Sequence, residues 1–191
     1  MLADKLDRLL AAFRSHGIQP DLRSGATDAE LDQIEEALGL PLPADLRALW
    51  AWRNGHAHLP PGFSMAFMFR DSAFIGTPEV IGAREAVLRH ATEPEEWRRK
   101  TFDPIICIPI AAHGGLTAVS CGPQGDAPHL PNSVIELHGP MYTAYESIEK
   151  MVDTNLEIVE RLGQILTTAA HEQAMEIRRR HNPLIPVHQN K

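Results

Sequence analysis

This chain has few cysteines, few aromatic residues and no long apolar run. Its 191 residues include 2 cysteines and 6% aromatic residues, a composition that excludes a disulfide-rich secreted scaffold. No apolar run reaches the roughly 20 residues that a membrane-spanning helix requires. Residues 1–5 also lack the basic-then-apolar order of a signal peptide. We therefore expect a cytoplasmic protein in which Cys107 and Cys121 are reduced and buried.

Basic residues are also scarce. The chain has 18 lysines and arginines against 25 acidic residues, and its net charge is -7. Phosphate-rich surfaces repel such a chain, so we expect no binding to nucleic acid and none to a membrane. Two short basic runs, at residues 98–100 and 178–180, lack interleaved aromatic residues and are typical of solvated helix ends. The charge balance instead permits a basic protein as partner.

The sequence contains no strong catalytic or metal-binding motif. His56 and His58 have the alternate spacing of a metal pair, but their loop is rich in proline and glycine and offers no third ligand. Ser120 and Cys121 end an apolar run and are the nearest candidates for a nucleophile, yet no motif supplies a base. We therefore expect no catalytic residue, no metal and no cofactor, and an enzyme is the least favoured function.

An acidic amphipathic helix is the clearest element. Thr27 followed three residues later by Glu30 forms a capping box, which predicts a helix start. The apolar stripe of this helix consists of Leu31, Ile34 and Leu38. The other side is acidic, and we expect Asp32, Glu35 and Glu36 to bind the partner. Two alternatives stay open, namely that this side is only solvated and that Glu35 pairs with a neighbouring base for structural reasons.

A second helix follows and carries a family resemblance. Pro43 fits its first position, and its apolar spacing predicts that Trp50 lies in the core. The order L-G-L-P-L-P, D-L-R-A-L-W and N-G resembles the N-terminal signature of the SUKH superfamily, which contains the Smi/Knr fungal cell-wall regulators and many bacterial immunity proteins. The matching residues are Leu31, Ile34, Glu35, Leu38, Gly39, Leu42, Pro43, Asp45, Leu49, Trp50, Asn54 and Gly55.

The rest of the sequence predicts an α+β fold. Apolar spacing predicts helices over residues 2–16, 77–90 and from Ser147, and strands over 65–69, 105–110, 116–121 and 133–138. Pro109 points to an edge or a bulge in its strand. This order resembles the SUKH sheet, with Ser147 introducing the closing helix. The predicted fold is thus a mostly antiparallel sheet packed with N-terminal helices and followed by a long C-terminal helical extension.

The predicted domain organisation has three parts. Residues 1–152 form the SUKH-like domain with its N-terminal helix, 153–180 a helical extension, and 181–191 a tail. The extension continues an apolar stripe of Leu156, Val159, Leu162 and Leu166, with Gly163 as a weak point. This stripe would either pair two copies in a homodimer or pack back on its own domain.

The resemblance implies a non-catalytic protein-binding module. Among the members of the SUKH superfamily, this chain most resembles the immunity proteins, which neutralise a toxin, frequently a nuclease, by direct binding. An acidic inhibitor would gain association rate and specificity towards a basic toxin domain. The alternative is a regulatory scaffold similar to the fungal cell-wall regulators. Asp126, Glu136 and the loop at residues 56–62 are further candidate surfaces.

Overall fold

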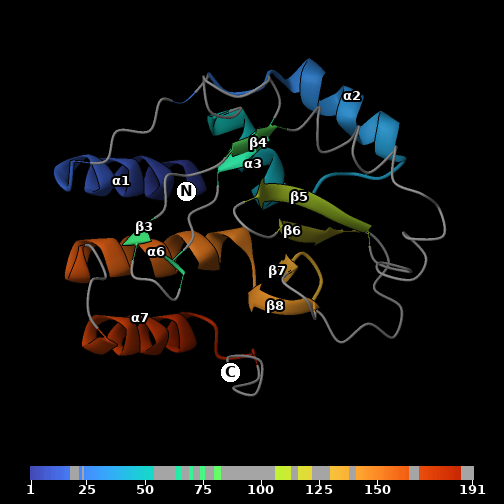
Figure 1. The fold of residues 1–191 in the computed structure, drawn as a ribbon. Coiled ribbons are helices and arrows are strands. Elements are labelled where there is room, and N and C mark those ends of the chain that lie inside the picture. Colours follow the sequence, from blue (N-terminus) through green and yellow to red (C-terminus); the bar gives the residue numbers. More distant parts are fainter. Residues whose placement is uncertain are drawn as a thin grey trace.

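The computed structural model confirms the α+β class (Figure 1). The structure describes residues 1–17, 22, 24–53, 63–65, 69–70, 74–75, 80–82, 106–112, 116–121, 130–137, 141–163 and 168–185. Its helices are α1 (Leu2–Ser15), α2 (Asp28–Leu38), α3 (Ala44–Trp52), α6 (Ile148–Leu162) and α7 (Thr168–His181). Helix α6 lies between α1 and α7 and packs against both (Figure 1).

The main sheet is antiparallel and follows the order of the chain. Its four strands are β5 (Ile106–Ala112), β6 (Leu116–Cys121), β7 (Val134–Leu137) and β8 (Met141–Tyr145). The register of β5 against β6 shifts between Pro109 and Ala111, which confirms the predicted irregularity, and β5 lies at one end of the strand order. Strand β8 was not predicted from the sequence, although its threonine and two tyrosines favour a strand.

The segment at residues 77–90 departs from the predicted helix. Val80–Gly82 forms strand β4, which pairs antiparallel with β1 (Phe63–Met65) and places Ser64 opposite Ile81. β-branched residues such as valine and isoleucine favour strands, and pairing with a distant segment outweighs the helical spacing here. The helix prediction is therefore wrong at these positions, and the rest of it lies outside the described residues.

The predicted strand at residues 65–69 is also only partly matched. Met65 ends β1, whereas Phe69 begins β2 (Phe69–Arg70), which pairs with β3 (Phe74–Ile75) in a separate two-stranded sheet. One apolar run in the sequence therefore contributes to two different strand pairs.

Helix ends follow their local sequence signals. The amide of Thr27 donates to Glu30 Oε2 at 2.8 Å and Thr27 Oγ1 accepts from the Glu30 amide at 3.3 Å, which confirms the capping box. Gly39 ends α2 in the left-handed region with φ 68°. Pro43 is the N-cap of α3, one position before the predicted place. Ser147 caps α6 by accepting from the Lys150 amide at 3.1 Å.

The core joins the helices to one face of the sheet. Trp50 has no exposed surface and belongs to this cluster, which confirms its predicted place in the core. The cluster includes Leu6, Leu9 and Phe13 of α1, Leu46 and Leu49 of α3, Val119, Cys121 and Val134 of the sheet, and Ile148, Val152, Leu156 and Val159 of α6. Among the described residues, no helix is both long and apolar enough to cross a membrane.

The stripe of the C-terminal extension is covered by the chain itself where the structure describes it. Leu156 and Val159 are buried in the main core, and Leu162 is partly buried against the cluster of Ile158 with Ala174 and Ile177 of α7. Leu166 lies outside the described residues. Gly163 follows α6 with φ 60° and is the predicted break. Because the chain's own helices cover Leu156, Val159 and part of Leu162, the described part of the stripe favours the alternative of packing back on its own domain. The homodimer through residues 153–180 stays a prediction. Helix α6 runs unbroken through residue 152, and the domain division there stays a prediction.

Candidate functional site

The acidic side of α2 is the largest surface of one charge sign that the sequence singled out. Asp28 and Glu30 lie in the first turn, where the helix dipole favours negative charge. Hydrogen bonds from the backbone and the hydroxyl of Thr27 hold the pKa of Glu30 below its usual value. We use the name α2 acidic surface for three of the exposed carboxylates of this helix, Asp28, Asp32 and Glu36, and leave out Glu30, which belongs to the cap.

Arg47 of α3 forms ion pairs with carboxylates of α2. Its guanidinium Nη2 lies 2.8 Å from Asp32 Oδ1 and 3.2 Å from Asp28 Oδ1, and Nη1 lies 3.2 Å from Glu35 Oε2. The hydrogen bond to Asp32 is the main cause that raises the pKa of Arg47 above its ordinary value. The side chain of Asp32 nevertheless remains 66% exposed and that of Asp28 90% exposed. Arg47 therefore orders these carboxylates without covering them.

The three predicted binding residues differ in their surroundings. Glu35 is partly buried, pairs with Arg47 through one oxygen and accepts the Leu42 amide through Oε1 at 2.9 Å. This carboxylate thus ties α2 to the connection before α3, as the structural alternative for Glu35 anticipated. Asp32 and Glu36 are exposed. Of the predicted set, these two are placed where a partner can reach them.

Ser120 and Cys121, the nearest candidates for a nucleophile, are buried side chains of strand β6. Ser120 is fully buried, and its hydroxyl lies 3.0 Å from the Leu130 carbonyl oxygen and 3.3 Å from Ser133 Oγ. Cys121 is also fully buried, as predicted. Within the described residues, no group of three or more histidine, cysteine or acidic side chains is arranged to hold a metal. His56, His58 and Asp126 lie outside those residues.

The basic run at residues 178–180 is largely engaged within the chain. Arg178 hydrogen-bonds to the Ala144 carbonyl, and Arg180 pairs with Glu157 of α6. Hydrogen bonds from Arg161, His181 and Arg180 lower the pKa of Glu157 from 4.5 to about 2, against the opposing effect of its burial. Of these three arginines, Arg179 is exposed and takes part in none of the contacts just described. The sequence pattern alone did not reveal these partners, because they lie on other elements.

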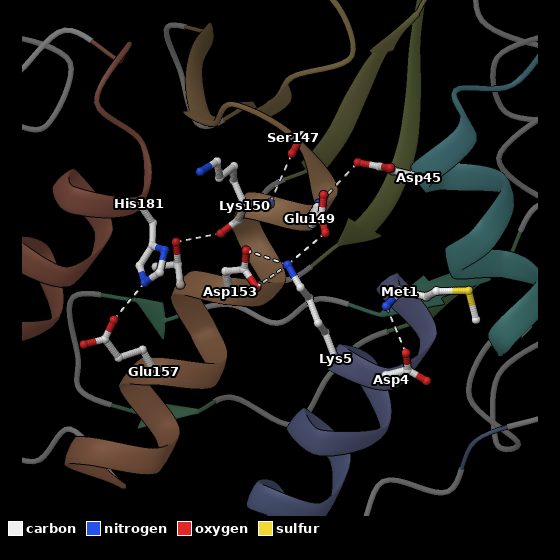
Figure 2. A network of polar contacts seen from close by, with 11 residues as sticks. Met1, Asp4, Lys5, Asp45, Ser147, Glu149, Lys150, Asp153, Glu157 and His181 are labelled. Carbon is white, nitrogen blue, oxygen red and sulfur yellow. Dashed lines mark hydrogen bonds and ion pairs between the residues drawn. The ribbon is translucent and has the colours of Figure 1, made fainter.

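A second polar network joins α1, α3 and α6 (Figure 2). Lys5 Nζ lies 2.8 Å from Glu149 Oε1 and 2.8 Å from Asp153 Oδ1. Asp45 of α3 accepts the Glu149 amide at 3.4 Å, so that its carboxylate adds to the Ser147 cap at the α6 N-terminus. These residues hold α1 and α3 to the start of α6, a role that the sequence analysis did not assign.

The fold and the α2 acidic surface together define an α+β domain with an ordered acidic helix at its N-terminal side. Residues 25–152 match the model of the SMI1 / KNR4 family (SUKH-1), and this chain belongs to that family. No curated protein matches the chain significantly. The matched region begins just before the α2 cap and ends within α6, so α1 and α7 lie outside it.

Proposed function

We propose that this chain is a non-catalytic immunity protein of the cytoplasm that neutralises a basic toxin domain by binding it through the α2 acidic surface. Family membership supports a protein-binding role. The observation that carries the proposal is the arrangement around Arg47, where one guanidinium meets the carboxylates of α2 and leaves Asp28 and Asp32 largely exposed. With Glu36 exposed one turn further on, the surface stays negative and fits a positively charged partner.

Inhibition by occlusion requires no reactive group on the inhibitor. It requires a rigid surface that complements the toxin, and Arg47 reduces the freedom of Asp28 and Asp32 before binding. Opposite charge also raises the association rate, which matters when a toxin must be captured before it acts. The contacts between α2 and α3 thus supply the order, and the exposed carboxylates supply the charge.

The direct test first searches the neighbourhood of the gene for a toxin-like reading frame and then expresses its product together with this chain. We expect wild-type protein to restore growth and to block the toxin's activity in a purified assay. The variant Asp32→Lys/Glu36→Lys should lose most of this protection. Its matched control is Glu172→Lys/Glu176→Lys, because both pairs are exposed, lie four residues apart on a helix and change the charge equally.

Two outcomes would count against the proposal. Full protection by the folded Asp32→Lys/Glu36→Lys variant would place the binding surface elsewhere. Binding that leaves the partner fully active would favour the alternative, a regulatory scaffold similar to the fungal cell-wall regulators. Circular dichroism of both charge-reversal variants shows whether each is folded before either result is interpreted.

A further inference from the structure

Helix α6 lies between α1 and α7, and both of these flanking helices lie outside the family match (Figure 1). Their apolar contacts differ. Ala174 and Ile177 are the buried side chains of α7, and they pack with Ile158 in a cluster that is separate from the main core. The buried side chains that α1 adds to the main core are Leu2, Leu6, Leu9, Leu10 and Phe13. Helix α1 is therefore part of the core, whereas α7 packs on a small apolar contact outside it.

Helix α7 buries little apolar surface of its own. It has 14 residues, a length at which an isolated helix is only marginally stable in water. Most of its exposed side chains are polar or charged, among them Glu172, Glu176 and Arg179. A surface helix is stabilised mainly by the apolar face that it buries, and here the buried part of that face is one alanine and one isoleucine. Polar contacts must therefore supply much of the attachment.

Polar contacts hold the C-terminal end of α7 to α6. Glu157 of α6 pairs with Arg180, and its Oε2 lies 2.8 Å from His181 Nε2. Asn182, just beyond the helix, donates through Nδ2 to Thr154 Oγ1 at 3.1 Å. The Arg180 side chain is 56% exposed, and dissolved ions weaken ion pairs at such exposed positions. The attachment of α7 thus depends in part on charges that salt can screen.

The other side of α6 provides a matched comparison. There Lys5 of α1 pairs with Glu149 and Asp153, each at 2.8 Å, so that the same kind of ion pair joins α6 to α1. Those pairs add to an extensive apolar contact, because α1 and α6 share the main core. Leu156 and Val159 of α6 belong to that core and keep α6 in place independently of α7. Weaker ion pairs should therefore release α7 but neither α1 nor α6.

We propose that α7 is a detachable helix, which Glu157 holds against α6 and which separates from it when the Glu157 ion pairs are weakened, while the main core stays folded. In the attached state α7 covers Ile158, and Leu162 is partly buried beside it. Separation uncovers these apolar side chains next to the negative charge of Glu157. The C-terminal helix thereby makes access to this face of α6 depend on ionic strength. This proposal is independent of the toxin-binding surface on α2.

Hydrogen exchange of the full-length chain, resolved into peptides by mass spectrometry, tests the proposal. The Glu157→Gln variant keeps the size of the side chain and removes its charge, and the matched control Asp153→Asn removes one carboxylate from the pairs with Lys5. A peptide covering residues 168–182 should exchange roughly tenfold faster in Glu157→Gln than in wild type, because charge-assisted hydrogen bonds are lost. In Asp153→Asn it should exchange at the wild-type rate, because detachment of α7 leaves the Lys5 pairs intact. A peptide covering residues 148–159 should be the slower of the two in every protein, because it opens only when the core unfolds.

Equal acceleration of both peptides in Asp153→Asn would show that α7 opens only when the whole chain unfolds. An unchanged α7 peptide in Glu157→Gln would show that Glu157 does not hold the helix, and either result would overturn the proposal. If circular dichroism shows that Glu157→Gln is unfolded, wild type is measured at low urea concentrations instead. Exchange of residues 168–182 should then rise less steeply with urea than exchange of residues 148–159, because detaching one helix exposes less surface than unfolding the core. Equal slopes would overturn the proposal in that case.

Discussion

Lys5 of α1 and Asp153 of α6 form an ion pair at 2.8 Å, and Lys5 also pairs with Glu149 one turn earlier (Figure 2). Lys5 precedes the region that matches the family, and Asp153 directly follows it. The pair therefore joins two segments from either side of the family domain. Together with the packing of Leu6 and Leu9 in the core, it makes α1 part of the same folded unit as α6.

We expect Lys5→Met to lower the free energy of unfolding by about 1 kcal/mol, because it leaves two partly buried carboxylates without their cation. Urea unfolding at neutral pH measures this, with the exposed Arg14→Met in the same helix as control. Hydrogen bonds to Asp153 and Glu149 raise the pKa of Lys5 although burial opposes them. Its contribution is thus complete below the unfolded value of about 10.4 and is lost as the pH rises further. Equal stability of Lys5→Met and Arg14→Met would show that the ion pairs contribute nothing.

The acid side of the stability profile depends on Glu157. Its pKa falls from 4.5 to about 2, first through the hydrogen bond from Arg161 of the same helix and then through those from His181 and Arg180 at the end of α7. A lowered folded pKa contributes stability above the unfolded value, and this contribution disappears as the pH falls from 4.5 towards 2. Glu157→Gln should therefore be less stable at neutral pH and lose less on acidification. Thermal unfolding across this pH range, with exposed Glu172→Gln as control, measures the difference; parallel profiles for wild type and Glu157→Gln would contradict it.

The two tryptophans of α3 should respond differently to substitution. Trp50→Ala should cost about 3 to 5 kcal/mol, because it empties a fully buried site. Trp50 Nε1 has no hydrogen-bond partner among the described residues, whereas Trp52 Nε1 donates to Asp7 at 2.8 Å. Replacement by phenylalanine should therefore sacrifice a hydrogen bond at Trp52, worth about 1 kcal/mol, but none at Trp50. Urea unfolding separates these effects, and a Trp50→Ala protein with wild-type thermal stability that had lost partner binding would refute the core assignment.

Local signals in the sequence predicted the local parts of the fold. The Thr27 and Ser147 caps and the irregularity at Pro109 depend on neighbouring residues, so they could be identified before the structure. Pairing of Val80–Gly82 with Phe63–Met65 depends on a distant partner, and helical spacing misled the prediction there.

The candidate site shows the same limit. The acidity of α2 is visible in the sequence. The sequence does not show that Glu35 is partly buried and paired whereas Asp32 and Glu36 are exposed. This difference arises because Arg47 and the Leu42 amide lie next to Glu35 only after α3 has packed against α2. In the same way, the hydrogen bond from Arg178 to the Ala144 carbonyl forms only because α7 packs beside the end of β8, and the sequence around Arg178 does not predict it.

The different surroundings of Glu35 and Glu36 should give different losses of stability when each is replaced by alanine. Glu35→Ala should lower the free energy of unfolding by about 1 to 2 kcal/mol, because the Leu42 amide loses its acceptor and Arg47 loses one partner. Glu36→Ala, exposed on the next position, should change it by less than about 0.5 kcal/mol. Chemical unfolding of both variants tests the contrast, and comparable losses in the two proteins would mean that Glu35 has no special structural role.

The functional prediction concerns rates. If the α2 acidic surface attracts a basic toxin domain, Asp32→Lys/Glu36→Lys should lower the association rate constant by a large factor and change the dissociation rate constant by a smaller one. Exposed charges act mainly while the two proteins approach each other. The rate for wild type should fall steeply with added salt, and the rate for this variant should depend on salt much less. Surface plasmon resonance or stopped-flow fluorescence at several ionic strengths gives both quantities, with Glu172→Lys/Glu176→Lys as the control of equal charge change. If the control lost as much rate as the α2 variant, net charge alone would explain the effect, and the assignment of the surface to α2 would fail.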